Sequence, residues 1–278
     1  VVPWTVYRFY GDRRVLERHY DAMARWVRYV RAGNPDGIWR ERVGNNYGDW
    51  LSIPPDATPK DVMATAYFAH SVDLLTRIAT ILGRAADARE FGGLRDAVRD
   101  AFQRAFVRPD GRVGADTQTG YALALRFDLL PDGLRDAAAG RLAELIDGNG
   151  GRLSTGFPGT AHLLPALTDA GRLDTAYRVL FARGVPSWRH MIENGATTIW
   201  ERWDGWTPER GFQDAGMNSF NHYAFGTVGE WIFSTVAGLA PDPDIPGWQR
   251  VIIHPRPGGG LTRMNATYAS LYGRVESA

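Results

Sequence analysis

Apolar side chains recur every three or four positions through most of the chain, which is the period of an amphipathic α-helix. Within residues 12–32, for example, Leu16, Tyr20 and Val27 would share one face of a helix. The same period predicts further strong helices over 61–82, 86–107 and 217–238, and weaker ones over 117–129, 134–147, 159–171 and 173–183. The pattern therefore predicts a largely helical protein.

Glycines mark several joints between these helices. Gly11, Gly83 and Gly171 each stand between one apolar run and the next. Because glycine readily adopts the left-handed conformation that ends a helix, these joints predict antiparallel helical hairpins. The intervening segments rich in Gly, Asn, Pro and aromatic residues are predicted loops, at 33–59, 108–116, 148–158 and 184–216.

The pattern changes after Leu239. Prolines at 241, 243 and 246 stiffen a connector, and residues 248–254 and 261–275 then alternate as strands do, with Thr, Tyr and Val favoured. We therefore expect two domains, a helical one over residues 1–240 and the beginning of a β domain over residues 241–278.

Composition narrows the class of protein. The formal net charge is +1, so the chain offers no field that would favour nucleic acid or an anionic membrane. It contains no cysteine, its apolar runs are too interrupted to predict a membrane span, and no signal peptide opens it. No dinucleotide loop, nucleophile elbow or metal-ligand spacing occurs, so we expect no metal and no cofactor. The compartment is not indicated.

The segment 196–206 carries the most chemistry. It reads ATTIWERWDGW, with Glu201 between Trp200 and Trp203 and with Asp204 directly after. Tryptophan rings offer flat apolar faces to sugar rings, and carboxylates bond hydroxyls or move protons. The segment is therefore a candidate carbohydrate site. The alternative is that the tryptophans belong to the core and that the acids face solvent, which would explain the same sequence.

Three other segments are candidates. Residues 45–51 read NNYGDWL and place Asp49 beside Trp50, although an Asp in a turn and a Trp in the core would give the same pattern. Residues 217–223 put His222 in the first turn of a predicted helix, where a structural, hydrogen-bonded histidine is the alternative. Residues 154–162 resemble a helix entry with exposed backbone amides.

As an ordered set, these segments resemble the α-L-rhamnosidases of glycoside hydrolase family 78. The resemblance rests on residues 1–12, 47–51, 154–157, 186–188, 195–205 and 218–226. It implies an (α/α)6 barrel of the six-hairpin glycosidase type, followed by a β-sandwich. It also implies hydrolysis of terminal α-L-rhamnosyl residues from a rhamnose-containing glycoside or oligosaccharide, with inversion of the anomeric centre.

The resemblance also implies roles for particular residues. Glu201 takes the position of the general base that activates the attacking water. The implied sugar contacts are Asp49, Trp50, Trp200, Trp203, Asp204 and His222. The oligomeric state is not implied.

The sequence departs from the family in two important respects. The acid-rich segment that carries the family's general acid has no equivalent here, and the chain has fewer predicted helices than a closed barrel needs. We therefore expect an incomplete barrel whose general acid lies outside the chain, unless Glu41, Glu193, Asp204 or Asp214 takes its place. Two other functions stay open, a six-hairpin glycosidase for another sugar and a non-catalytic carbohydrate-binding protein.

Overall fold

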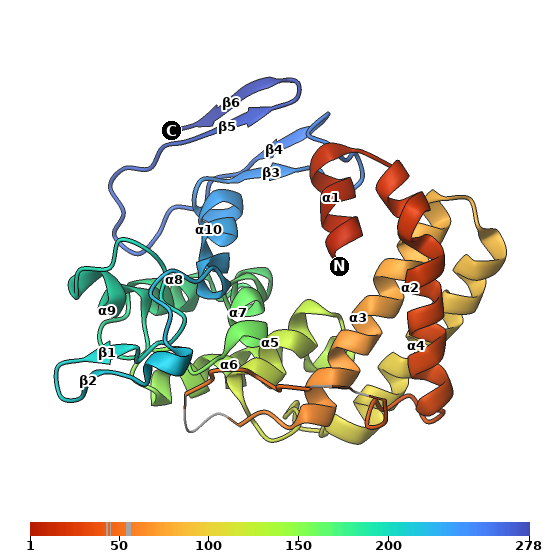
Figure 1. The fold of residues 1–278 in the computed structure, drawn as a ribbon, viewed down its shortest axis with the longest axis horizontal. Helices are drawn as coiled ribbons and strands as arrows, with labels where there is room; N and C mark the ends of the chain where they lie inside the picture. The colour runs from red at the N-terminus through yellow and green to blue at the C-terminus, as the bar shows by residue number, and fades with distance from the viewer. Residues whose placement is uncertain (43, 45, 54–56) are drawn as a thin grey trace.

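The computed structural model describes residues 1–42, 44, 46–53 and 57–278. Asn45 of the predicted cluster at 45–51 lies outside these residues. The helices form an open ring, and four short strands lie along one side of it (Figure 1). The helices are α1 (Val2–Tyr10), α2 (Arg14–Gly33), α3 (Lys60–Ile81), α4 (Ala85–Phe106), α5 (Gln118–Arg126), α6 (Arg135–Gly148), α7 (Phe157–Asp169), α8 (Leu173–Phe181), α9 (Trp188–Glu193) and α10 (Val228–Trp231).

The apolar period predicted most of these helices correctly. The helices expected over 12–32, 61–82 and 86–107 are confirmed as α2, α3 and α4, and the four weaker ones as α5 to α8. The predicted face of α2 is buried, since Leu16, Tyr20 and Val27 are at most 3% exposed.

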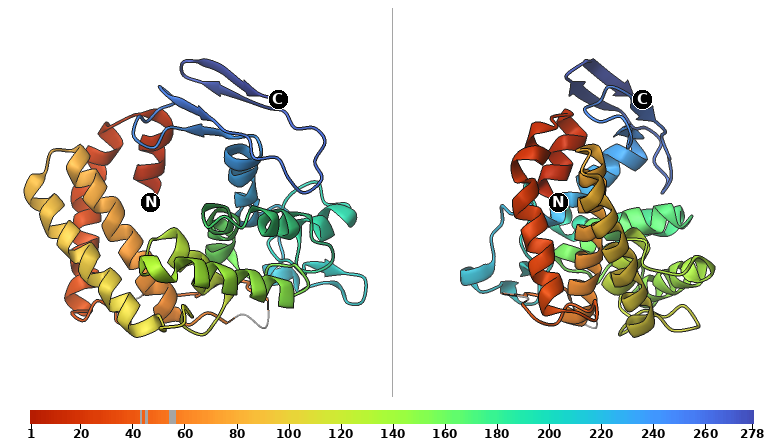
Figure 2. Two further views of the ribbon diagram at one scale, coloured as in Figure 1. Left: turned by 180° about the vertical axis from the view of Figure 1, so that it is seen from behind. Right: turned by 90° about the vertical axis from the view of Figure 1, so that its right-hand side faces the viewer.

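Neighbouring helices pack as hairpins around a shared core. Helix α3 packs along α4, and α5 packs against both α6 and α7. Helix α5 is buried from Gln118 to Leu125, so it lies among neighbouring helices within the wall of the ring. Figure 2 shows this ring from behind and from one side. In the described parts of the chain, no helix combines the length and the apolar character that crossing a membrane requires.

The prediction of one strong helix over residues 217–238 is wrong. A 3-10 turn precedes Asn218, and residues 218–223 are not helical. A 3-10 turn (Ala224–Thr227), α10 and a π-helical turn (Ile232–Val236) then follow in series. The backbone explains the difference, because the amide of His222 donates to the carbonyl of Ile199, 2.8 Å away, rather than to a helical neighbour.

Helix α9 lies inside a segment that was predicted to be a loop. Its six residues are too few to show a period, but Ser187 begins it as an N-cap that accepts from the amide of His190 at 2.9 Å.

The strands pair as antiparallel hairpins. Strand β3 (Leu239–Pro241) pairs with β4 (Val251–Ile253), and β5 (Ala266–Ser270) pairs with β6 (Gly273–Ser277). A smaller hairpin, β1 (Trp206–Thr207) with β2 (Gly211–Phe212), follows the tryptophan-rich segment. Strands β4 and β5 fall inside the two segments predicted to be extended, and β6 begins in the second segment but ends two residues beyond it. Strand β3 was not predicted.

Candidate active site

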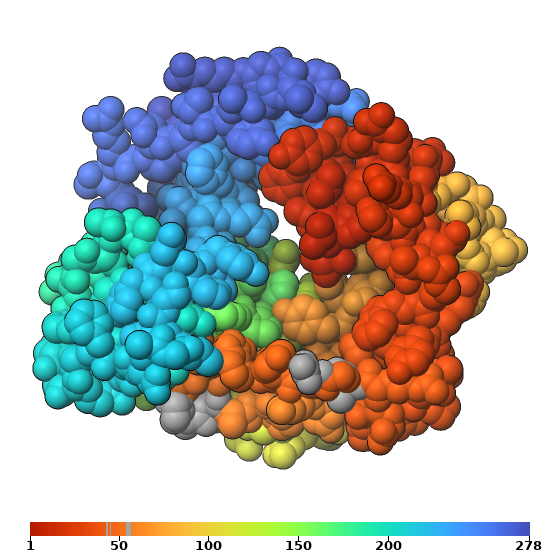
Figure 3. Space-filling view, viewed as in Figure 1, coloured from red at the N-terminus to blue at the C-terminus, as the bar shows by residue number. Residues whose placement is uncertain are grey.

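A cavity of about 690 Å³ opens inside the ring of helices. Its described lining residues are Trp39, Asn46, Tyr47, Gly48 and Trp50, then Met63, Ala64 and Tyr67 of α3, Phe157 and Pro158 of α7, and finally Glu201 and Met217. Figure 3 shows a hollow near the centre of the molecule between these segments. The volume is within the range of pockets that hold small ligands.

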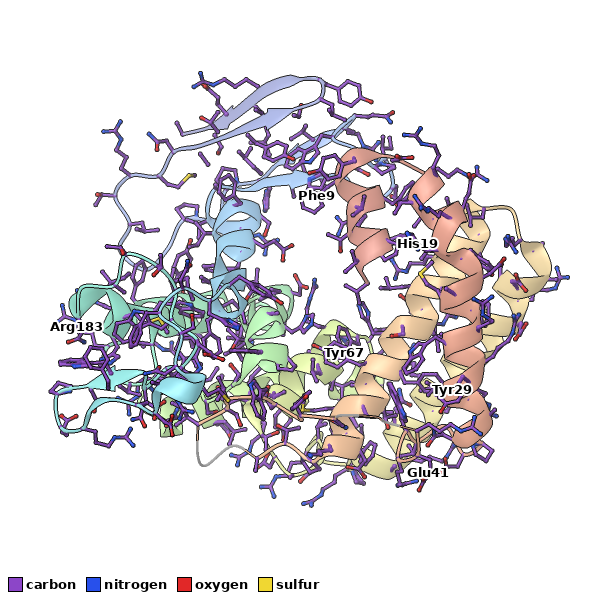
Figure 4. All side chains as sticks on the ribbon, in the orientation of Figure 1. Phe9, His19, Tyr29, Glu41, Tyr67 and Arg183 are labelled. Atoms are coloured by element: carbon purple, nitrogen blue, oxygen red, sulfur yellow. The ribbon has the colours of Figure 1, made fainter. Side chains whose placement is uncertain are left out.

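Aromatic rings form much of the wall. Trp50 and Tyr47 meet edge to face with centroids 5.1 Å apart, and they are 36% and 62% exposed. On the opposite side, the hydroxyl of Tyr67 donates to the carbonyl of Pro158 at 3.1 Å. Figure 4 shows Tyr67 on the inner side of α3, toward the middle of the ring. Flat apolar faces beside polar tips are suited to a sugar, which has both C–H faces and hydroxyls.

Glu201 is the one carboxylate among the described residues that line this cavity. Its backbone amide donates to the carbonyl of Ser219 at 2.8 Å, and its Oε2 accepts from the amide of Ser219 at 2.8 Å. These two bonds, together with the bond from His222 to Ile199, hold residues 199–201 against residues 219–222. The carboxylate is therefore oriented by rigid backbone and not by a flexible side chain.

Trp200 and Trp203 are not among the residues that line this cavity, and their role as sugar platforms stays a prediction. They are 5% and 1% exposed. Trp203 stacks on Phe225 at 3.8 Å between centroids, and its indole N–H donates to the carbonyl of Thr155 at 3.0 Å. Trp200 packs edge to face on Phe220 at 4.9 Å. Both rings belong to the core that supports Glu201, which was the alternative explanation of the motif.

Asp204 lines a different, smaller cavity, and its sugar contact likewise stays a prediction. Its two carboxylate oxygens accept from Arg202 and Arg210, each at 3.1 Å, and its side chain is 17% exposed. Asp204 therefore braces the turn that follows Trp203.

Asp49 is also not among the residues that line this cavity, and the direct sugar contact expected of it stays a prediction. It is 8% exposed. Its carboxylate accepts from the hydroxyl of Thr119 at 2.5 Å and from the amides of Gly156 at 2.9 Å and Gly159 at 3.2 Å. The neighbouring Trp50, by contrast, does line the cavity, as expected of a residue that contacts sugar.

His222 lies next to the cavity but behind one of its walls. Its ring stacks on Phe157, which lines the cavity, with centroids 5.0 Å apart. Its Nδ1 accepts from the amide of Ala224 at 3.3 Å, which leaves the proton of a neutral ring on Nε2. Because residues 218–223 are not helical, the first-turn position expected for His222 is wrong.

The sequence did not single out Tyr67 or His70, and it included His162 only as the last residue of the candidate segment 154–162. Burial, and after it the negative charge of Asp49, raises the pKa of Tyr67, so its hydroxyl stays protonated and can donate. Burial lowers the pKa of His70 to about 4 and that of His162 to about 3. Phe127 stacks on His70 and contacts His162 edge to face. The inward-facing period of α3 was the available signal for Tyr67.

The alternative general acids do not reach the cavity. Glu193 is paired with Arg183 and Arg189, and Asp214 caps the turn at Gly216. Figure 4 places Glu41 and Arg183 at the outer edge of the molecule. Asp204 is held as described above. Within the described residues, no group of three His, Asp or Glu side chains is arranged to hold a metal ion.

Comparison with known proteins gives the class of protein first. Residues 1–236 match the family model described as the bacterial α-L-rhamnosidase six-hairpin glycosidase domain, and residues 238–278 match the one for the bacterial α-L-rhamnosidase C-terminal domain. A six-hairpin glycosidase domain agrees with the open ring of paired helices. The chain belongs to the bacterial α-L-rhamnosidase family.

Curated relatives carry the same name. An α-L-rhamnosidase of Streptomyces avermitilis is 51% identical over 99% of this chain, and one of Formosa agariphila is 38% identical over all of it. The chain spans only 26% and 30% of the length of these two proteins.

Solved structures agree with the fold along almost the whole chain. The S. avermitilis α-L-rhamnosidase in complex with L-rhamnose superposes with a TM-score of 0.93 at 50% identity, covering 99% of this chain and 26% of that one. The Aspergillus terreus α-L-rhamnosidase superposes with a TM-score of 0.91 at 35% identity, covering 99% of this chain and 32% of that one.

Proposed function

We propose that this chain supplies the base side of an inverting α-L-rhamnosidase site. In this proposal Glu201 removes a proton from the water that attacks the anomeric carbon of a terminal α-L-rhamnosyl residue. One observation carries the proposal: Glu201 is the one carboxylate among the described lining residues of an aromatic-walled cavity. The family membership and the L-rhamnose bound to a relative in its solved structure support the choice of sugar.

The hydrogen bond to Ser219 gives the carboxylate a defined task. The Ser219 amide donates to Oε2 and so orients the carboxylate, which would accept the proton of the water. The O–H bond of water breaks, its oxygen bonds to the anomeric carbon, and the glycosidic bond breaks on the opposite side of the sugar ring. Inversion follows from that geometry.

The departing oxygen needs a proton in this mechanism. In an inverting enzyme the acid lies about 6.5–9.5 Å from the base, which leaves room for the water. Because no described lining residue other than Glu201 is a carboxylic acid, we infer that the acid belongs to a segment outside this chain.

Two further residues keep proposed roles at the sugar. Trp50 would stack on an apolar face of the ring, since it lines the cavity and is partly exposed. His222 would lie at the edge of the sugar site, since its ring stacks on Phe157, which lines the cavity.

The experiment uses two rhamnosides that differ in leaving group. p-Nitrophenolate leaves without prior protonation, whereas methoxide needs an acid. We expect the chain to hydrolyse p-nitrophenyl α-L-rhamnoside slowly and methyl α-L-rhamnoside not at all. Glu201→Gln should abolish the slow reaction, and Glu209→Gln, which changes an exposed acid on the β1–β2 hairpin, should leave it unchanged. Equal hydrolysis by wild type and Glu201→Gln would contradict the proposal.

The division into two domains is also a proposal. Strand β3 starts at Leu239 and crosses the expected boundary at 240/241, and the two family matches change at residues 236–238. These observations support a helical domain that ends within a few residues of the expected position.

A further inference from the structure

Two segments form adjacent parts of the cavity wall. One is the loop that carries Tyr47 and Trp50, and the other is the start of α7. The two segments are more than a hundred residues apart in sequence. The backbone joins them twice, because the amide of Phe157 donates to the carbonyl of Trp50 at 2.9 Å and the amide of Ile53 donates to the carbonyl of Ser154 at 3.0 Å. The position of the Trp50 ring therefore depends on how this junction is held.

Asp49 holds the junction from inside. Its carboxylate accepts hydrogen bonds from the amides of Gly156 and Gly159 at the start of α7. It also accepts one from the hydroxyl of Thr119 in α5. These amides have no partner within the helix itself, and α7 has no acidic residue in its first turn. The negative charge of Asp49 therefore complements the positive end of the helix dipole from a different segment.

The packing leaves the junction no room to move. A Cβ atom on Gly156 would stand 2.2 Å from the carbonyl oxygen of Trp50 and 2.7 Å from the amide nitrogen of Ser52. A Cβ atom on Gly159 would stand 2.1 Å from Oγ1 of Thr119. The two glycines let the loop and α5 come close enough for Asp49 to reach all three donors.

We infer that Asp49 is a positioning residue for the sugar site, which acts through Trp50 and Phe157 without touching the sugar. It clamps the Trp50 loop onto the start of α7 and thereby sets the separation of two aromatic walls of the cavity. The inference rests on the proposed function of the cavity as a sugar site. It assigns Asp49 a task that differs from the direct sugar contact the sequence suggested.

The position of Trp50 is measured first, without any sugar. In the chain labelled with 5-fluorotryptophan, Trp50→Phe assigns the fluorine signal of Trp50. Asp49→Ala is expected to shift or broaden that signal, Asp49→Asn to change it less because one acceptor oxygen remains, and Thr119→Val to change it in the same direction. An unaltered Trp50 signal in Asp49→Ala and Thr119→Val would overturn the inference.

The matched control is Asp242→Ala. Asp242 is as buried as Asp49, at 7% exposed, and its carboxylate also accepts from two backbone amides and one side chain, but it lies at β3. This variant removes a comparable set of hydrogen bonds and should leave the Trp50 signal in place. If it disturbs Trp50 as much as Asp49→Ala does, the effect is a general loss of stability and the inference is wrong.

Sugar binding is measured second, by titration with L-rhamnose. Loss of a group that orients a binding residue commonly weakens binding about tenfold or more, so the dissociation constant should rise about tenfold in Asp49→Ala, partly recover in Asp49→Asn and stay unchanged in Asp242→Ala. An unchanged constant beside a displaced Trp50 would overturn the inference. Absence of binding in the wild type would instead contradict the proposed function, because the fluorine result does not depend on sugar.

Discussion

Gly159→Ala tests how tightly the start of α7 is packed. The new Cβ would stand 2.1 Å from Oγ1 of Thr119 and 2.9 Å from its Cβ and Cγ2. Real Cβ contacts are longer than this, so Thr119 would have to move and release the carboxylate of Asp49. The variant tests the structure of the junction and requires no activity.

The magnitude follows from three contributions. A hydrogen bond to a charged group stabilises a protein by about 1.5–3 kcal/mol, and overpacking costs about 1–3 kcal/mol. Replacing glycine by alanine in a helix recovers about 1 kcal/mol. The apparent free energy of unfolding should therefore fall by roughly 1.5–5 kcal/mol.

Urea denaturation followed by circular dichroism measures the change, and Gly140→Ala is the control. Gly140 lies within α6 with no heavy atom inside 4 Å of the added Cβ, so this variant should be as stable as the wild type or more stable by up to about 1 kcal/mol. If Gly159→Ala matched Gly140→Ala in stability, the packing argument at α7 would be refuted.

Three other predictions concern stability. Trp203→Ala should lower the free energy of unfolding by about 3–5 kcal/mol, because this ring is 1% exposed. Trp26→Ala, at a ring that is 49% exposed, should lower it much less, and thermal melts of both variants measure the difference. Burial lowers the pKa of His162 to about 3, so on acidification this histidine is protonated in the unfolded chain before it is protonated in the folded one. Stability should therefore fall as the pH drops from about 6.5 toward 3. In thermal melts at a series of pH values, His162→Gln should lose less stability over this range. Hydrogen bonding to Arg141 lowers the pKa of Asp116 to about 2, so the stability it contributes is present above about pH 4 and lost toward pH 2, and Asp116→Asn should remove that part of the acid transition. An acid transition identical to that of the wild type would contradict either pH prediction for the variant that shows it.

The sequence predicted the elements whose apolar period coincides with burial. Helix α2 shows this, because the residues at its helical spacing are the buried ones. The period failed over residues 217–238, where the partly buried Phe220 and the buried Trp231 are covered by different neighbours. Phe220 packs on Trp200, and Trp231 contacts Tyr177 in α8. A period in sequence does not reveal that residues 219–222 bond to residues 199–201.

The candidate site was predicted in part. Glu201 and Trp50 line one cavity, but the tryptophans beside Glu201 turn into the core. Composition alone cannot separate a ring that supports a carboxylate from a ring that faces a sugar, because both need the same residue type. Asp49 was a candidate because it stands beside Trp50. Thr119, Gly156 and Gly159, which donate hydrogen bonds to it, lie 70–110 residues away in sequence, and no local pattern indicates them.

The central claim is that Glu201 is the base of an inverting rhamnoside hydrolysis. The most direct measurement follows p-nitrophenyl α-L-rhamnoside with this chain by proton NMR, which reports both the rate and the anomer first released. We predict slow release of β-L-rhamnose that disappears in Glu201→Gln and persists in Glu209→Gln. Release of the α-anomer first, no hydrolysis by the wild-type chain, or undiminished hydrolysis by Glu201→Gln would contradict the claim.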